Sequence, residues 1–392
     1  MFTRSGSHAR LTWFSGEEPD VVGETTVRTQ EGPKADDWTS IGLAPVKSKD
    51  PLIWRAGMRV LKAELSIPRS AAVAINKGEL LGRARIAPAD HRLSATGVRS
   101  ILSVNKGLVM PIWADIPASG YEVDHLALRR LDVSPDGQTR TVLELEDEIG
   151  DNIARHVWDS GVVALAVIAD MCSKIPRSGS TAPMPLLRDL LLQEGKLHIL
   201  EIGCGIGTVG IGVAALLQAC ADDRPLEATI LLTDLPDAEE RAVANISRFQ
   251  EAAVGRRSGT GTQLEYGNLD WEDGRRGVFP PKVDSVSWDL VVLSDCTYNV
   301  DTLPALVQTL SALKRSSGDR GTGHSADSSL RILVATKERH SSERAFFDLM
   351  STAGWTVSES LVLPLPVLAA PSESIELYLF DGGLAALDLG QT

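Results

Sequence analysis

Short apolar segments alternate with segments of helical periodicity from about residue 150 to residue 385. The apolar segments, each typical of a buried strand, are LHILEIG (197–203), ATILLTDL (228–235), TQLEYGNLDW (262–271), SWDLVVLSD (287–295), LRILVATKE (330–338) and SIELYLF (374–380). The helical segments are 158–171, 208–221, 238–252, 302–315 and 342–354. Strands that alternate with helices form a parallel sheet with helices on both faces. The sequence therefore predicts an α/β fold with a doubly wound, mostly parallel sheet.

The first 140 residues have a different pattern. Alternating stretches such as MRVLKAELSI (58–67) and ELLGRARIA (79–87) are separated by Pro, Gly and Asn, which predicts short strands. The segment SPDGQ (134–138) separates two further alternating stretches and predicts a β-hairpin with a Pro-Asp-Gly turn. Because a length of 392 residues suggests two domains, we expect a β-rich region at 1–140, an α/β domain at 141–385 and a tail at 386–392.

Composition and charge exclude several classes of protein. With 39 Lys+Arg against 52 Asp+Glu and a net charge of −13, the chain lacks the basic surface of a general nucleic-acid binder. No stretch approaches the ~20 apolar residues of a membrane-spanning helix, and no secretory signal is visible. Four cysteines without a C-x-x-C pair argue against a zinc site or a disulfide scaffold. We therefore expect a cytoplasmic or nuclear monomer without a metal site, whose acidic charge suits a basic partner.

The strongest local motif is LEIGCGIGTVG (200–210), where the first strand of the α/β domain runs into a glycine-rich turn and a helix. Glycines at this point let the backbone approach a ligand closely, and the helix N-terminus exposes N–H donors. Gly205, Gly207 and Gly210 satisfy the dinucleotide template G-x-G-x-x-G, so the turn alone leaves an NAD-dependent oxidoreductase open. Counted from Gly203, however, the sixth template position is Thr208 rather than glycine.

Two acidic residues accompany the glycine turn. Glu201 stands two positions before Gly203, and the pattern E-x-G-x-G-x-G resembles the signature loop of S-adenosylmethionine-dependent methyltransferases. The cofactor of those enzymes carries an ammonium and a sulfonium. An anionic residue near the loop attracts these cations, whereas it would repel the pyrophosphate of a dinucleotide. Asp234 ends the second strand, where an acid accepts ribose hydroxyls in either class of enzyme. It therefore predicts a nucleoside site without choosing the cofactor.

Further motifs follow the next two strands. The third strand leads into Leu269-Asp270-Trp271, and the fourth into Leu293-Ser294-Asp295-Cys296-Thr297-Tyr298. With Val157-Trp158-Asp159 upstream, the order along the chain is tryptophan, E-x-G-x-G-x-G, acid, L-D-W and D-x-x-Y. Over about residues 140–385 this order resembles the seven-β-strand protein-lysine methyltransferases, also called methyltransferase family 16.

That resemblance implies a seven-stranded Rossmann-like sheet, S-adenosyl-L-methionine as the cofactor, and methyl transfer to a lysine amine of a protein substrate. The residues that it places around the cofactor are Trp158, Glu201, Gly203, Cys204, Gly205, Gly207, Asp234, Asp270, Trp271 and Ser294. It places Asp295 and Tyr298 near the transfer point as catalytic residues. The region 1–140 lies outside the resemblance, and we expect it to pack against the α/β domain and to help select the substrate.

Three alternatives stay open at this point. They are an NAD-dependent oxidoreductase on a Rossmann fold, a methyltransferase that acts on a small molecule, and a methyltransferase-like scaffold without activity. Titration with S-adenosylhomocysteine and with NAD separates the first alternative from the others. The intact glycines, Asp234 and the D-x-x-Y motif argue against an inactive scaffold.

Overall fold

The computed structural model describes the backbone of most of the chain and the side chains from residue 85 onward. The described ranges are 2–5, 8–14, 21–30, 38–42, 52–54, 60–66, 81–88, 90–103, 106–116, 126–134, 141–148, 152–173, 182–220, 226–253, 261–319, 330–367 and 371–382. Most of the predicted turn at 134–138 and the predicted tail at 386–392 lie outside these ranges. Parts of the polar segments 173–185, 255–262 and 314–329 do so as well. No helix within them is both long enough and apolar enough to span a lipid bilayer.

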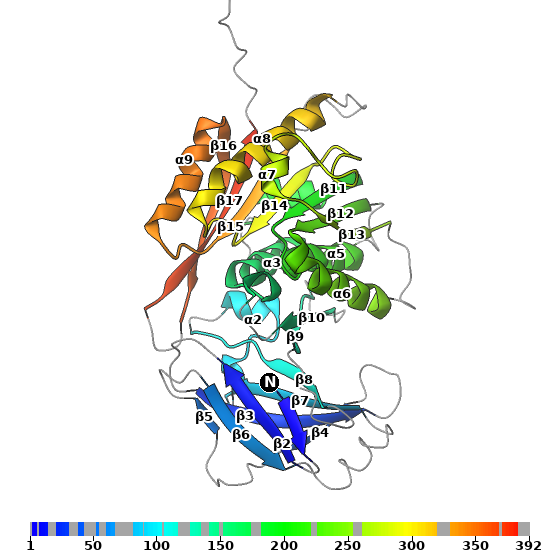
Figure 1. The fold of residues 1–392 in the computed structure, drawn as a ribbon, viewed down its shortest axis with the longest axis vertical. Helices are drawn as coiled ribbons and strands as arrows, with labels where there is room; N and C mark the ends of the chain where they lie inside the picture. The colour runs from blue at the N-terminus through cyan, green and yellow to red at the C-terminus, as the bar shows by residue number, and fades with distance from the viewer. Residues whose placement is uncertain are drawn as a thin grey trace, which may run out of the picture.

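A seven-stranded sheet forms the centre of the C-terminal part (Figure 1). Its strands, in spatial order, are β13 (Gln263–Asn268), β12 (Leu226–Asp234), β11 (Gly195–Ile202), β14 (Leu290–Ser294), β15 (Arg331–Thr336), β17 (Glu373–Gly382) and β16 (Trp355–Leu365). The first five are parallel to one another, and β17 runs antiparallel to both of its neighbours. This arrangement confirms the predicted doubly wound, mostly parallel α/β sheet.

Helices cover both faces of this sheet (Figure 1). They are α3 (Asp159–Cys172), α4 (Pro185–Leu191), α5 (Thr208–Cys220), α6 (Pro236–Ala253), α7 (Trp271–Gly274), α8 (Leu303–Asp319) and α9 (Ala345–Thr352). One apolar core lies between the sheet and helices α3 to α6, and a second lies between the sheet and helices α8 and α9. Because successive side chains of a strand point to opposite faces, Ile199 of β11 lies in the first core and Leu200 in the second.

Several elements differ from those predicted from the sequence. The predicted strand 262–271 ends at Asn268, because Asp270 caps the short helix α7 and Trp271 begins that helix. The predicted helix 342–354 begins as a 3-10 turn, η6 (Ser341–Arg344). Strand β16 and helix α4 were not predicted: β16 is an edge strand with Pro364 next to its last residue, and α4 has only seven residues.

The N-terminal part contains two antiparallel sheets. The smaller sheet has the order β1 (Phe2–Ser5), β2 (His8–Phe14), β6 (Val60–Ser66). The larger has the order β10 (Val142–Glu148), β9 (Leu126–Asp132), β8 (Ile112–Ile116), β7 (Leu81–Pro88), β3 (Val21–Gln30), β4 (Trp38–Gly42), with β5 (Leu52–Trp54) paired to β3. Strands β6 and β7 confirm the segments predicted at 58–67 and 79–87, and the antiparallel pair β9–β10 confirms the predicted hairpin.

The two parts share one apolar core. Leu131 and Val133 at the end of β9, and Leu143 and Leu145 of β10, belong to the same buried cluster as helices α3 and α5. A short helix, α2 (Val98–Ser103), also packs against α3. The predicted boundary at residue 140 falls between β9 and β10, and the division of the chain into domains stays a prediction.

Candidate functional site

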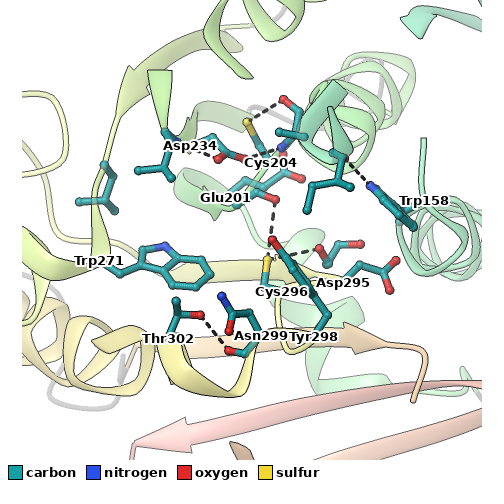
Figure 2. Close-up of a pocket in the computed structure, with 18 of the residues that line it drawn as sticks. Trp158, Glu201, Cys204, Asp234, Trp271, Asp295, Cys296, Tyr298, Asn299 and Thr302 are labelled. Atoms are coloured by element: carbon teal, nitrogen blue, oxygen red, sulfur yellow. Dashed lines mark hydrogen bonds between the residues drawn. The ribbon is translucent and has the colours of Figure 1, made fainter. Parts of the chain in front are cut away.

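A cavity of about 420 Å³ opens beyond the carboxyl ends of β11, β12 and β14 (Figure 2). Ligands of open α/β sheets bind at this edge, next to the point where the strand order reverses. The cavity brings together nearly all the site residues predicted from the sequence, which are Trp158, Glu201, Gly203, Cys204, Gly205, Asp234, Asp270, Trp271, Ser294, Asp295 and Tyr298. Gly207 is the one predicted residue that does not line it.

The glycine loop between β11 and α5 needs glycine for two different reasons. Gly203 and Gly205 have φ angles of 67° and 54°, in the left-handed region, and both line the cavity. A Cβ atom on Gly203 would lie 2.5 Å from the Cys296 sulfur, so no side chain fits there. Gly207 has a φ of 87°, and a Cβ on it would lie 2.6 Å from Leu232. This third glycine therefore lets the loop pack on β12 and does not itself form the cavity wall.

Glu201 is buried at the end of β11, with 2% of its surface exposed. Its Oε2 accepts a hydrogen bond of 2.8 Å from the backbone N–H of Gly210 in α5. Burial raises the pKa of Glu201 to about 8, because the carboxylate has lost its water. A positive group placed in the cavity would restore the charged form of this side chain, so the position suits a cationic ligand.

Asp234 ties the end of β12 to the glycine loop. Its Oδ2 accepts from the Gly205 N–H at 2.8 Å, and its Oδ1 accepts from the Leu235 N–H at 2.7 Å. Burial raises the pKa of this carboxyl, and the hydrogen bond from Gly205 opposes that rise. Each oxygen keeps a second acceptor position, which is what two ribose hydroxyls require.

Trp271 and Trp158 lie at opposite ends of the cavity in Figure 2. Asp270 caps α7 by accepting a 2.8 Å hydrogen bond from the Glu272 N–H, and this cap sets the position of Trp271 at the start of the helix. The Trp271 ring comes within 3.6 Å of the Cβ position of Gly203. A flat ring beside the glycine loop provides a stacking surface for a nucleobase.

Asp295 follows β14 and has a φ of 54°, the only positive φ of a non-glycine residue in the described ranges. Its Oδ2 accepts from the Ser160 N–H at the start of α3 at 3.0 Å, and its Oδ1 accepts from Arg339 at 2.8 Å. Burial raises the pKa of Asp295, and the nearby guanidinium opposes that rise. Backbone strain at a buried, charged residue is typical of functional sites.

Arg339 was not predicted from the sequence, although it lines the cavity. Its guanidinium lies over the Trp158 ring, 5.2 Å from the centroid, and so connects Trp158 with Asp295. The available signal was a charged residue shortly after the fifth predicted strand, at the edge where ligands bind. Ala154, His156, Cys296, Asn299 and Thr302 also line the cavity and were not assigned to it.

The mouth of the cavity carries two exposed aromatic side chains. Tyr298 is 52% exposed and Trp158 is 39% exposed, and both line the cavity. Ser294 lies deeper, where the Cβ position of Gly161 in α3 would be 3.1 Å from its hydroxyl. The Cys204 and Cys296 thiols are buried, and burial raises the pKa of each well above its ordinary value, so neither is poised to act as a thiolate.

The lining fits the cofactor that the sequence predicts. The acidic residues of the lining are Glu201, Asp234, Asp270, Glu272 and Asp295, whereas its one arginine, Arg339, is already paired with Asp295. An acid-rich cavity attracts a ligand with a sulfonium and an ammonium and repels a pyrophosphate. Together with the glycine loop and Trp271, these residues suit S-adenosylmethionine rather than NAD.

Comparisons with known proteins agree with this lining. A sequence model described as lysine methyltransferase matches residues 138–353. A UPF0665 family protein of Schizosaccharomyces pombe is 22% identical over 68% of this chain and 66% of its own length. Protein N-lysine methyltransferase METTL21A of Danio rerio is 30% identical over 43% of this chain and 57% of its own length. The chain thus spans less than two thirds of either relative.

Among the solved structures that the chain matches is TYW2 from M. jannaschii in complex with AdoMet. It is 12% identical, with a TM-score of 0.31, over 69% of this chain and 91% of that chain. The residues matched by the lysine methyltransferase model make up more than half of the chain and contain the glycine loop, Asp234, Trp271 and the D-x-x-Y motif. The chain therefore belongs to the lysine methyltransferase family, whose cofactor is S-adenosyl-L-methionine.

Proposed function

We propose that the chain transfers a methyl group from S-adenosylmethionine to the side-chain amine of a lysine in a protein substrate. The observation that carries this proposal is the mouth of the cavity, where exposed Tyr298 and Trp158 flank the buried carboxylate of Asp295. Aromatic faces and carboxylates attract an alkylammonium group. The family membership supports the same acceptor, as does the similarity to the protein N-lysine methyltransferase of Danio rerio.

The cofactor supplies an electrophilic methyl group on a sulfonium. The residues that we assign to holding it are Trp158, Glu201, Gly203, Cys204, Gly205, Asp234, Asp270, Trp271 and Ser294. In this assignment Asp234 accepts from the ribose hydroxyls, and Trp271 lies against the adenine. Gly207 acts indirectly, by allowing the glycine loop to pack on Leu232.

The acceptor lysine must lose its proton before it attacks, because an ammonium has no free lone pair. Insertion of the lysine between the aromatic walls would strip water from its amine, which favours the neutral form, and the same walls would orient it towards the methyl group. Asp295 serves as a positioning residue in this scheme, since both of its oxygens already accept hydrogen bonds, from Arg339 and from the Ser160 N–H. We assign Tyr298 to the wall along which the lysine enters.

The net charge of −13 suggests a basic protein as the partner, and the chain is proposed to act as a cytoplasmic or nuclear monomer. The N-terminal sheets are proposed to contribute to substrate choice.

Incubation of the purified full chain with cell extract and radiolabelled S-adenosylmethionine tests the proposal. We expect labelled protein bands whose label resides on lysine by mass spectrometry. Tyr298→Ala should abolish the label, and Val300→Ala, which changes an exposed apolar residue outside the cavity lining, should retain it. S-adenosylhomocysteine should bind to all three proteins.

Cofactor binding without any labelled product would favour an inactive scaffold. Label found only on small molecules or on nucleic acid would show that the methyl acceptor is not a protein. Either result contradicts the proposed acceptor and leaves the cofactor assignment intact.

A further inference from the structure

Strand β10 belongs to the N-terminal sheet, yet it carries a carboxylate on its buried face. Leu143, Leu145 and Asp147 share that face, and Asp147 is only 4% exposed. Leu143 and Leu145 lie in the core shared with α3 and α5. A charge in an otherwise apolar row is costly unless it is fully paired, so the partners of Asp147 indicate what it is for.

Asp147 links the N-terminal sheet to the cavity wall. Its Oδ2 accepts from the Arg129 Nε of β9 at 2.7 Å, and its Oδ1 lies 3.2 Å from the Nδ1 of His156. Arg129 also donates to the Met110 carbonyl at 3.0 Å, just before β8. Because His156 lines the cavity, a continuous polar chain runs from β8 and β9 through Asp147 to the cofactor site.

The same wall has a second anchor on β10. Arg155 donates to Glu148 at 2.7 Å and to the Asp237 carbonyl of α6 at 2.8 Å, so the segment 152–156 is held between β10 and α6. This segment includes the turn η2 (Ile153–Arg155), and its Ala154 carbonyl lies 3.1 Å from the Cβ position of Gly205. The segment therefore lies directly against the glycine loop.

A third link reaches the glycine loop itself. Asn245 of α6 is fully buried, and its Oδ1 accepts from the Glu146 N–H of β10 at 2.6 Å. Its Nδ2 donates to the Glu146 carbonyl at 3.1 Å and to the Ile206 carbonyl at 3.0 Å. One side-chain amide thus pairs with the edge of the N-terminal sheet and with the residue between Gly205 and Gly207.

We propose that β10 is a structural part of the cofactor site: through Asp147 and Asn245 it positions the 152–156 segment and the glycine loop to bind S-adenosylmethionine. Three polar connections from one strand converge on the cavity wall, and Glu146, Asp147, Glu148 and Asn245, which make them, all lie outside the family motifs. A wall that is already in place when the cofactor arrives loses less conformational freedom on binding, which raises affinity. Asp147 and Asn245 are positioning residues in this account, because they act through His156 and Ile206.

Calorimetric titration of the full chain with S-adenosylhomocysteine tests this inference. Asp147→Asn and Asn245→Ala should each weaken binding by about tenfold, the effect of losing roughly one charge-assisted or buried hydrogen bond. Glu144→Gln is the matched control. The Glu144 carboxylate lies on the same strand but pairs with Arg130 at 2.8 Å and with Arg248 at 4.0 Å, and not with the 152–156 segment. This variant should bind within about twofold of wild type. Affinities of the Asp147 and Asn245 variants that equal the control would overturn the inference.

Hydrogen exchange on the wild-type protein provides a measurement that needs no variant. Addition of S-adenosylhomocysteine should slow amide exchange in β10 and in 152–156 as well as in the glycine loop. Protection confined to the glycine loop and α5, with β10 unchanged, would contradict the inference even if the variants fail to fold.

Discussion

Arg339 and Asp295 form an ion pair with 2.8 Å between Nη1 and Oδ1, at the edge of the cavity where β14 and β15 end. The carboxylate is buried, whereas the guanidinium is 31% exposed and lies over the Trp158 ring. The pair therefore joins the D-x-x-Y motif to Trp158, the tryptophan that precedes α3.

 

Two motifs far apart in the sequence thus meet through one arginine that belongs to neither of them.

Replacement of Arg339 by methionine should lower the free energy of unfolding by about 1–3 kcal/mol, because it leaves a buried carboxylate without its cation. Urea denaturation at pH 7 measures this change. Arg276→Met is the control, since Arg276 pairs with Asp273 on the surface, where both side chains are more than half exposed. Removal of such a surface pair costs less than about 1 kcal/mol. Equal losses for the two variants would mean that the Asp295 pair has no special role.

Substitutions of Asp295 separate positioning from proton transfer. We expect Asp295→Ala to abolish methyl transfer while S-adenosylhomocysteine still binds. Asp295→Asn keeps an oxygen that can accept from the Ser160 N–H, so it should retain measurable transfer if the residue positions the site. Transfer assays on the labelled substrate, with calorimetry in parallel, provide both readouts. Wild-type turnover by the alanine variant would refute the assignment.

The protonation of Glu201 should make stability depend on pH. Its pKa is about 8 in the folded protein and 4.5 for the ordinary side chain, so the folded state holds one proton more than the unfolded state between these values. The free energy of unfolding therefore falls as pH rises across this window, by at most about 1.4 kcal/mol per pH unit from this group. Urea denaturation at several pH values should show a shallower fall for Glu201→Gln. Parallel curves for the two proteins would contradict the assignment of a buried, protonated Glu201.

Three glycines with different backbone angles and surroundings should lose different amounts of stability when replaced by alanine. Gly203→Ala combines a positive φ with a collision against Cys296, and should destabilise the protein by about 2 kcal/mol or more and abolish S-adenosylhomocysteine binding. Gly354→Ala has a φ of 81° and open space around it, so it should cost about 1 kcal/mol and leave binding unchanged. Gly267→Ala meets its nearest neighbour at 3.7 Å and should be nearly neutral. Thermal unfolding with and without the ligand measures all three, and normal ligand binding by Gly203→Ala would contradict the role of the loop.

Asp147 should make the protein sensitive to acid. Burial alone would raise its pKa, but the hydrogen bond from His156 and the charge of Arg129 outweigh burial and hold the pKa of Asp147 below its ordinary value of 3.8. The stabilisation from this carboxylate is therefore present above about pH 4 and is lost as pH falls below that value. Asp147→Asn should be less stable than wild type at pH 7, and the difference should shrink towards pH 3. A difference that stays constant over this range would contradict the prediction.

Much of the central sheet was predictable because its buried strands are continuous apolar runs. The segments around Ile199 and Val291 have no polar face, as expected for parallel strands covered on both sides, and the glycine turn fixes where the first of them ends. Strand β16 lacks that signal, since its side chains are largely exposed and a proline, Pro364, stands next to its last residue. Its place in the sheet depends on pairing with β17, which local sequence does not encode.

Site residues that belong to a local motif could be predicted from the sequence, whereas residues placed by contacts between distant segments could not. Glu201, Asp234 and Trp271 stand at the ends of predicted strands, so the topology alone brings them to one edge. Asp147 did leave a local sign, an acidic residue in the apolar row of an alternating strand. Asn245 left none, because its partners Glu146 and Ile206 are 99 and 39 positions away along the chain.

The pairing of Asn245 with Glu146 also has a consequence for the order of events during synthesis. Strand β10 and its hairpin partner β9 leave the ribosome before α6, and 99 residues separate Glu146 from the asparagine that pairs with it. At a translation rate of 5–20 residues per second, the outer edge of β10 stays open for roughly 5–20 seconds. An unpaired strand edge is a template for association with other chains. We therefore expect this edge of β10 to be open to association with other chains until α6 has been made.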